Sequence, residues 1–182
     1  MNAAPETVFI VLFRGVGGAT QLPTAPLRKA LGDAGFDNVS TYINSGNAVL
    51  SSTLDAVQTH TEVAMIAKRD FGFEKEIMLV SRPDWQRLID ENPFPEAVDQ
   101  PTKLHAFVLK TAPAENAVKA LRARLTPPER VVVRKNFLYL HVPSGFSASK
   151  LPPIIDRVLD TVSTARNWRT VLALGRLAAE RQ

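Results

Sequence analysis

A glycine-rich segment, Arg14-Gly15-Val16-Gly17-Gly18, is the first part of the chain whose residue types suit ligand binding. Backbone N–H groups in such a turn, beside an arginine and before a helix, can hold a phosphate or a carboxylate. The spacing fits neither a Walker loop, which needs a closing Gly-Lys-Ser/Thr, nor a dinucleotide fingerprint, because Thr20 replaces the third glycine. We expect Arg14, Gly15, Gly17 and Gly18 either to contact an anion or to form a turn with positive φ angles.

A second polar segment, residues 41–47, places Tyr42, Asn44, Ser45 and Asn47 around a glycine. Asn and Ser side chains often bond to nearby backbone groups in turns, and the glycine then supplies the unusual dihedral angles. On that interpretation Tyr42 packs and the other side chains hold the turn. The alternative is that the four residues form the polar edge of a ligand site.

Two further candidate segments lie in the second half of the chain. Ser149 and Lys150 precede a predicted helix, whose positive end could attract an anion. Residues 147–150 also match Ser-x-x-Lys, but the downstream motifs of serine acyl-enzymes are missing. Arg166, Asn167 and Arg169 lie at another predicted helix start. We expect Asn167 to cap that helix, and the arginines to pair with a carboxylate of the protein or with an anionic ligand.

The remaining chemistry is limited by composition. The chain has no cysteine, which excludes disulfides, thiolate chemistry and Cys-based zinc sites. Its three histidines are scattered, so no metal site is predicted. His141 shares one strand face with Phe137 and Tyr139 by alternation. We expect it to be a hydrogen-bonded structural histidine, and a general base is the alternative.

The elements that would position these residues follow from periodicity and turn signals. In the first half they are a strand at 8–13, a helix at 23–34, strands at 39–43 and 48–51, a helix at 54–71 and a strand at 76–80. This order is the split β-α-β pattern of a ferredoxin-like unit. The strand at 8–13 is apolar at every position, which is typical of a strand buried on both faces. We therefore expect the second half to cover the face that the helices leave bare.

The same order recurs further along. After a short helix at 82–90 and a linker, we expect a strand at 104–109, a helix at 114–125, strands at 130–134 and 137–142, a helix at 151–159, a strand at 163–165 and a terminal helix at 168–179. The predicted fold class is α+β, with two packed ferredoxin-like halves, the second followed by a C-terminal helix. The predicted divisions are a subdomain at 1–81, a helix and linker at 82–102, and a subdomain at 103–182.

Charge is distributed unevenly over the 182 residues. The net charge is −5 over residues 1–102 and +9 over residues 103–182, which gives +4 for the chain. This asymmetry indicates either an anionic partner for the second half or mutual attraction of the two halves. A ferredoxin-like unit that reads RNA needs stacking aromatics on its central strands, and the strand at 48–51 has none. Nucleic acid is therefore a disfavoured ligand. The apolar run at 8–13 is too short for a membrane span or a signal segment, and we expect a cytoplasmic protein.

Several segments together resemble a bacterial family known as domain of unknown function 1697. They are Phe13 to Gly18, Thr41 to Asn47, Asn92-Pro93-Phe94, Leu138 to Pro143, Ser149-Lys150-Leu151 and Thr164 to Val171. The family usually has an Ile-Asn pair between the residues that correspond to Gly15 and Val16, and commonly Gln at position 44. The resemblance implies an α+β fold with two packed subdomains, and it implies no reaction.

The sequence thus favours a cytosolic binding protein for a small anionic or phosphorylated metabolite. Arg14, the glycine turn, Lys150, Arg166 and Arg169 are expected to line a cleft between the halves. The alternatives are a nucleic-acid or protein interaction module that uses the basic second half, and a hydrolase or transferase that uses His141 or Ser149. The sequence leaves both the cofactor and the oligomeric state unassigned.

Overall fold

A computed structural model describes residues 6–181 of the chain. The chain divides into two compact units, one made of Met1–Arg87 with Ala173–Gln182 and the other of Leu88–Leu172. Each unit contains one four-stranded antiparallel sheet. None of the helices in the described part has the length and apolarity that a membrane crossing requires.

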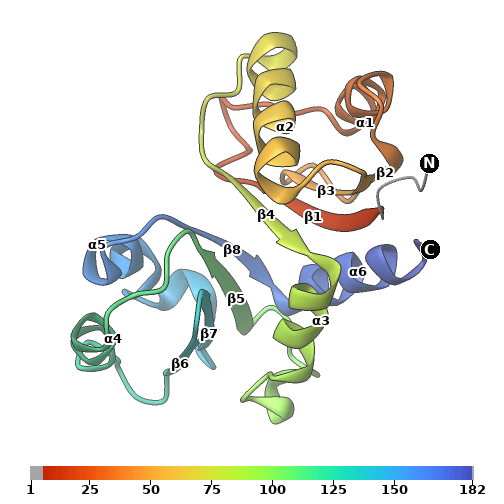
Figure 1. Ribbon diagram of the computed structural model, residues 1–182. Coiled ribbons are helices and arrows are strands. Elements are labelled where there is room, and N and C mark those ends of the chain that lie inside the picture. The colour runs from red at the N-terminus through yellow and green to blue at the C-terminus, as the bar shows by residue number, and fades with distance from the viewer. Residues whose placement is uncertain (1–5, 182) are drawn as a thin grey trace. The chain divides into compact units, whose positions relative to one another are not determined.

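The sheet of the first unit has the strand order β2-β3-β1-β4, and α1 and α2 lie on one of its faces (Figure 1). This is the ferredoxin-like arrangement that the element order predicts. The elements are β1 (Thr7–Phe13), α1 (Thr24–Asp33), β2 (Asp37–Thr41), β3 (Asn47–Ser52), α2 (Ala56–Phe71) and β4 (Ile77–Ser81).

Strand β1 is buried on both faces. Phe9, Val11 and Phe13 pack with Leu31 of α1 and Val63 of α2 in the core beneath the helices. The alternate residues Ile10 and Leu12, on the other face, are also fully buried. Each such side chain contributes roughly 1.5–3 kcal/mol to folding. Whether the second half covers that other face depends on how the units are placed and stays a prediction.

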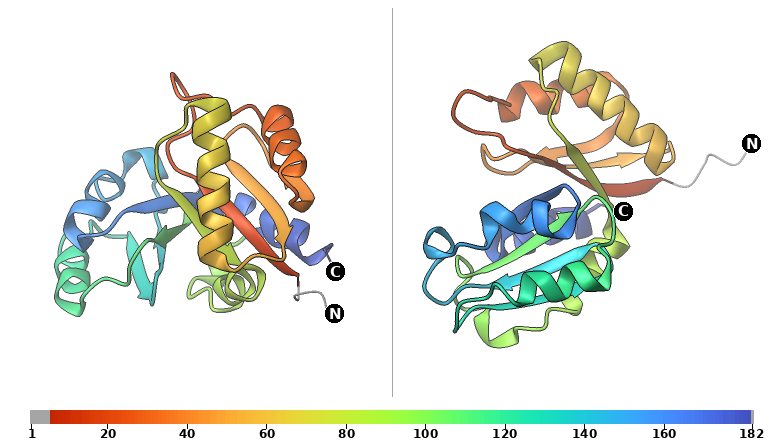
Figure 2. Two further views of the ribbon diagram at one scale, coloured as in Figure 1. Left: turned by 45° about the horizontal axis from the view of Figure 1, so that its top comes forward. Right: turned by 90° about the vertical axis from the view of Figure 1, so that its left-hand side faces the viewer.

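The second unit repeats this topology. Its strand order is β6-β7-β5-β8, and α4 and α5 pack on one face of the sheet (Figure 2). Its elements are β5 (Leu104–Leu109), α4 (Glu115–Arg122), β6 (Arg130–Arg134), β7 (Phe137–His141), α5 (Ile155–Leu159) and β8 (Ser163–Asn167). The predicted fold class, two ferredoxin-like halves with a helix after the second, is confirmed.

A helix follows the last strand of each sheet without a loop. Helix α3 (Arg82–Asp90) follows β4, and α6 (Trp168–Ala179) follows β8. Each helix is capped by the last residue of its strand: Ser81 Oγ accepts from the Asp84 N–H (3.3 Å), and Asn167 Oδ1 accepts from the Thr170 N–H (3.0 Å). The predicted cap at Asn167 and the predicted start of the terminal helix are therefore confirmed.

Several predicted bounds differ by a few residues from those in the structure, as for the helix predicted at 114–125, which is Glu115–Arg122. Two differences have a clear physical reason. Strand β2 ends at Thr41 rather than at residue 43, because Ile43 has a positive φ of 45° and belongs to the turn. The helix predicted at 151–159 is a 3-10 turn at Pro152–Ile154 followed by α5, which has five residues. Its first bond joins the Ile154 N–H to the Leu151 carbonyl (2.9 Å), because Pro152 and Pro153 have no N–H to donate.

Candidate functional site

The two polar loops of the first unit, residues 14–18 and 42–47, lie side by side. The Phe13 N–H donates to the Gly46 carbonyl (2.9 Å). A Cβ atom at Gly46 would lie 2.7 Å from the Phe13 carbonyl oxygen and 2.7 Å from Cγ2 of Val16, and Gly46 has a φ of +73°. Only glycine fits there, so both loops that the sequence singled out are fixed against each other by close packing.

Some backbone groups of the glycine loop form hydrogen bonds within the loop and the residues that follow it. The Gly17 N–H donates to the Thr20 carbonyl (2.7 Å), and the Thr20 N–H donates back to the Gly17 carbonyl (3.0 Å). Gly15, Gly17 and Gly18 all have positive φ angles, as the turn interpretation expects. The Gly17 N–H is thus engaged within the loop and does not face a ligand.

Two cationic residues adjoin this loop, Arg14 and Lys75. Arg14 is exposed, and its backbone N–H donates to the Glu76 carbonyl (3.0 Å). The Lys75 ammonium donates to the Gly15 carbonyl (2.9 Å). Lys75 was not singled out from the sequence, since nothing in the primary structure links it to a loop so far away along the chain.

In the hairpin turn, most polar atoms serve the turn itself. Asn47 is 1% exposed, and its Nδ2 donates to the Tyr42 carbonyl (3.0 Å) and to Ser45 Oγ (2.9 Å). The Tyr42 N–H donates to the Asn47 carbonyl (3.1 Å). These bonds favour the turn interpretation for Ser45 and Asn47. Asn44, in contrast, is exposed at the tip of the hairpin.

Asn44 borders a cavity of about 300 Å³ whose other lining residues are consecutive, from Gln21 to Pro26. This stretch forms the start of α1, which has Pro23 before it, no side-chain cap and no acidic residue in its first turn. The Thr24 and Ala25 N–H groups bond to no other described residue. Gln21 and Thr24 were not predicted as site residues, although Pro23 and Pro26 mark the helix start in the sequence.

Two candidate residues of the second unit, Ser149 and Lys150, lie in a turn before the short helix α5. Ser149 Oγ accepts from the Leu151 N–H (3.2 Å), so this hydroxyl holds a turn. Lys150 is exposed and precedes the 3-10 turn. Because α5 is so short and begins only at Ile155, the helix-end attraction expected at Ser149 and Lys150 is small.

Arg166 is half-buried in β8. Its Nη1 donates to Thr164 Oγ1 (2.8 Å) and to the Ala165 carbonyl (2.7 Å), and burial lowers its pKa to about 10. Arg169 is exposed at the start of α6. Arg14 belongs to the first unit and these arginines to the second, so a pocket that they share stays a prediction.

His141 is hydrogen-bonded, as expected. Its Nδ1 accepts from Nη2 of Arg130 (2.9 Å), which also pairs with Glu96. The Arg130 guanidinium lies over the ring of Phe94, 4.6 Å from its centre. Burial, followed by the positive charge of Arg130, lowers the pKa of His141, which favours the neutral ring that accepts this hydrogen bond. His141 thus helps hold the segment around Phe94 to the sheet.

His105 is a buried group that sequence reasoning missed. It is 9% exposed, its Nδ1 has no hydrogen-bond partner among the described residues, and its ring stacks on Phe146 at 3.9 Å. Burial lowers its pKa to about 4. The apolar strand around His105 contains no sequence signal for the burial of its Nδ1 atom or for its lowered pKa. No group of three or more His, Asp or Glu residues that could hold a metal occurs within residues 6–181.

Residues 7–139 match a protein family described as being of unknown function, DUF1697. The chain belongs to this family. The resemblance that the sequence motifs indicate is thus confirmed for DUF1697, and most of the first unit's loops lie within the match. A conserved bacterial protein from Streptococcus pneumoniae is similar to this DUF1697 chain in structure, with a TM-score of 0.73, 19% sequence identity, and coverage of 96% of this chain and 99% of that one. No curated protein matches the chain.

Proposed function

We propose that the protein binds a small anionic or phosphorylated metabolite, and that the anionic group enters the cavity between Asn44 and the start of α1. The observation that supports this proposal best is the cavity itself, because Asn44 of the hairpin lines it. Gln21, which also lines it, donates to the Gly18 carbonyl of the glycine loop. Its volume of about 300 Å³ lies at the lower end of the range for small-molecule sites.

The chemistry of the lining supports an anion rather than a cation. Of the described residues that line the cavity, none is acidic, and Thr24, Asn44 and Gln21 carry polar side chains. The Thr24 and Ala25 N–H groups point along the axis of α1, whose N-terminal end carries a partial positive charge. Arg28, one turn further along, donates to Thr41 Oγ1 (3.3 Å) and provides a full positive charge on the same helix.

The expected affinity is moderate. A hydrogen bond to a charged group contributes roughly 1.5–3 kcal/mol, so two or three such bonds could support a dissociation constant of about a micromolar order. No reaction is part of this proposal. We also propose that the protein is located in the cytoplasm of a bacterium. Its structural likeness to a bacterial protein supports the bacterial origin of the chain.

A thermal-shift screen of phosphate, sugar phosphates, nucleotides and organic acids would test the proposal, with calorimetry for each hit. Thr24→Asp places a carboxylate in the cavity at a helix position that favours acidic residues, so the fold should tolerate it. We expect affinity to fall at least about tenfold, since like charges repel. Ala56→Asp, at the exposed first residue of α2, is the matched control. A screen without hits, or unchanged binding in Thr24→Asp, would contradict the proposal.

A further inference from the structure

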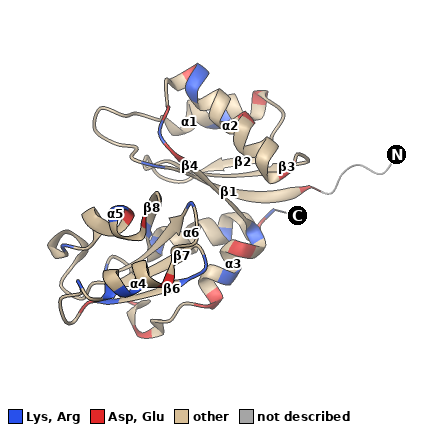
Figure 3. Cartoon of the chain, turned by 60° about the vertical axis from the view of Figure 1, so that its left-hand side comes forward, with Lys and Arg blue, Asp and Glu red and all other residues tan. Residues whose placement is uncertain are grey.

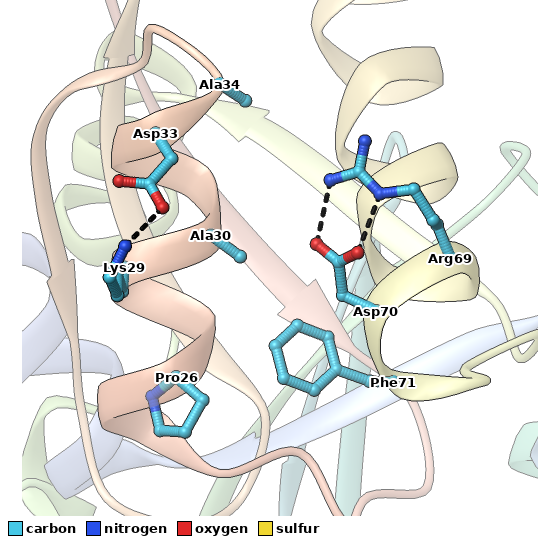
Figure 4. Close-up of a pocket in the computed structure, with 8 residues that line it drawn as sticks. All are labelled: Pro26, Lys29, Ala30, Asp33, Ala34, Arg69, Asp70 and Phe71. Atoms are coloured by element: carbon cyan, nitrogen blue, oxygen red, sulfur yellow. Dashed lines mark hydrogen bonds and ion pairs between the residues drawn. The ribbon is translucent and has the colours of Figure 1, made fainter.

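The charged side chains around a cavity of about 420 Å³ between α1 and α2 are already paired (Figure 4). On α1, Lys29 Nζ lies 2.5 Å from Asp33 Oδ2. On α2, Arg69 donates to Asp70 through Nε (2.6 Å) and Nη2 (2.8 Å). The four charges sum to zero, so this cavity selects no ligand by charge. The second unit differs, because it has unpaired positive charges beside the edge of its sheet.

Strand β6 is an edge strand of the second sheet, and one side of its backbone has no partner. The Leu109 N–H donates to the Asn136 carbonyl (2.8 Å), so the even-numbered positions from Asn136 onwards bond towards β5. The odd-numbered residues of β7 therefore bond to the residues opposite them at the two ends and the centre of β6. The N–H and C=O groups of Val131 and Val133 point away from β7 and bond to no other described residue.

This edge is regular and is lined by apolar side chains on the face that carries the helices. Strand β6 pairs with β7 over its full length, whereas the edge strand β2 of the first sheet has a register shift between Asp37 and Ser40. Val131 and Val133 pack in the core beneath α4, and Val133 is half-buried. A strand added beside β6 could thus form backbone hydrogen bonds and extend this core with its own apolar side chains.

Three cations without an ion pair lie next to this edge. Arg122 is the last residue of α4, which packs on β6, Arg124 follows it, and Lys135 lies in the turn between β6 and β7. All three are exposed, and none is within ion-pair distance of a carboxylate of residues 6–181. Glu129, just before β6, accepts from the Thr126 N–H (3.0 Å) and pairs with none of them. The positive charge around the edge therefore favours an acidic partner.

The same features distinguish one class of partner from others. Antiparallel pairing of β6 with its counterpart in a second copy, over the whole strand, would place Arg130 opposite Arg134, and like charges directly opposite each other destabilise a strand pair. A nucleic acid has no regular series of N–H and C=O groups to pair with Val131 and Val133. We propose that an extended acidic segment of a partner protein binds along β6 as an added strand. This surface does not depend on an anion in the cavity at Asn44.

The probe is the peptide Glu-Glu-Val-Thr-Val-Glu-Glu with blocked ends, added to the isotope-labelled full chain and followed by NMR. The comparison peptide has lysine in place of each glutamate. We expect the glutamate peptide to bind about tenfold more tightly at about 50 mM salt, and the difference to fall below about threefold at about 0.5 M, because salt screens exposed charges. Hydrogen exchange of the Val131 and Val133 amides should become slower on binding. Exchange at Val132, which already bonds to β7, should change little.

Two matched pairs of changes separate the backbone contribution from the charge contribution. N-methylation of both peptide valines removes the N–H groups that face β6 and should weaken binding about tenfold or more, whereas N-methylation of the threonine, whose N–H faces away, should not. Arg122→Gln should weaken binding of the glutamate peptide about threefold at low salt. Arg157→Gln, at an exposed position on α5 of the same unit, is the control and should bind as the wild type does.

Any of four results would overturn the proposal. The first is an absence of changes at the β6 amides with the glutamate peptide. The second is binding without slower exchange at Val131 and Val133, which would show attraction by charge alone. The third is an equal effect of the two methylations. The fourth is slow exchange at these amides in the free chain that increases with protein concentration, which would show that a second copy occupies the edge. Thermal unfolding of Arg122→Gln checks that the variant is folded.

Discussion

The residues of the motifs in the first unit have two kinds of role. Gly46 lets the hairpin contact the Arg14–Gly18 loop, and Asn47 bonds to the turn that contains Asn44. Gly46 and Asn47 therefore determine the shape of the two loops. Asn44, Thr24 and Gln21 face the cavity and could act on a ligand. A sequence motif in this chain therefore combines residues of two different kinds.

Replacing Gly46 by alanine should destabilise the first unit strongly. The new methyl group would lie 2.7 Å from a backbone oxygen, at a backbone conformation that alanine also disfavours. We expect a loss of about 2–4 kcal/mol in the free energy of unfolding, measured in urea. Gly18→Ala is the control, because it has a similar positive φ of +56° but no atom within 4 Å of the added Cβ, and it should cost only about 1 kcal/mol. Equal losses in the two variants would show that the contact at Gly46 is unimportant.

His105 should make stability depend on pH in mildly acidic solution. Its folded-state pKa of about 4 lies below the ordinary value of 6.5, so between these values the unfolded chain binds the proton first. Stability should therefore fall as the pH decreases from about 6.5 to 4, by up to about 3 kcal/mol. His141, whose pKa is also lowered, acts in the same direction.

His105→Leu should remove most of this pH dependence. It should also keep or raise stability at pH 7, because it removes a buried nitrogen that has no partner among the described residues. Urea unfolding at pH 7 and pH 5 measures both effects. A steep pH dependence that survives in His105→Leu would assign the effect to His141 or to carboxylates instead.

At the scale of elements, the two helices that follow the sheets depend on their caps. Asn167→Ala removes the acceptor for the Thr170 N–H and should cost about 1 kcal/mol, whereas Asn167→Asp keeps an oxygen there and should cost less. Thermal unfolding of the two variants measures the difference. If Asn167→Ala and Asn167→Asp unfold alike, packing of Trp168 rather than the cap determines where α6 begins.

Elements with strong local signals were predicted well, and elements that depend on tertiary context were not. The start of α6 follows from Asn167, and β1 follows from its apolar run. The end of β2 could not be predicted, because a positive φ at Ile43 is an exception for a branched residue. The cavity at Asn44 requires a helix and a hairpin to meet, and no spacing along the chain encodes that meeting.

At the scale of the whole molecule, the distribution of charge sets an expectation for nucleic acid. The lysines and arginines of the second half lie on several elements, among them α4, β6 and α6, and in the loops between elements (Figure 3). The phenylalanine and tyrosine residues of β5 and β7 that could stack on bases are all buried: Phe107, Phe137 and Tyr139. Tyr139 is further held by its hydroxyl, which donates to the Leu88 carbonyl (2.8 Å).

Binding to single-stranded RNA or DNA should therefore be weak, independent of sequence and strongly reduced by salt. Fluorescence anisotropy with labelled oligonucleotides of different sequence, between about 50 and 200 mM salt, measures this. Sequence-selective binding that persists at the upper salt concentration would favour the nucleic-acid alternative over the metabolite proposal.

The division of the chain also bears on the order in which the protein is made. The unit Leu88–Leu172 is continuous, whereas the other unit needs Ala173 and the residues after it, which are synthesised after the continuous unit. The second sheet can thus be complete on the ribosome while the first still lacks part of its fold. Val8 to Phe13 are made before the second unit, and the apolar residues on their second face can stay exposed while that unit is synthesised. Chaperone demand during synthesis should therefore come from the sheet of the first unit, although it is made before the sheet of the second unit.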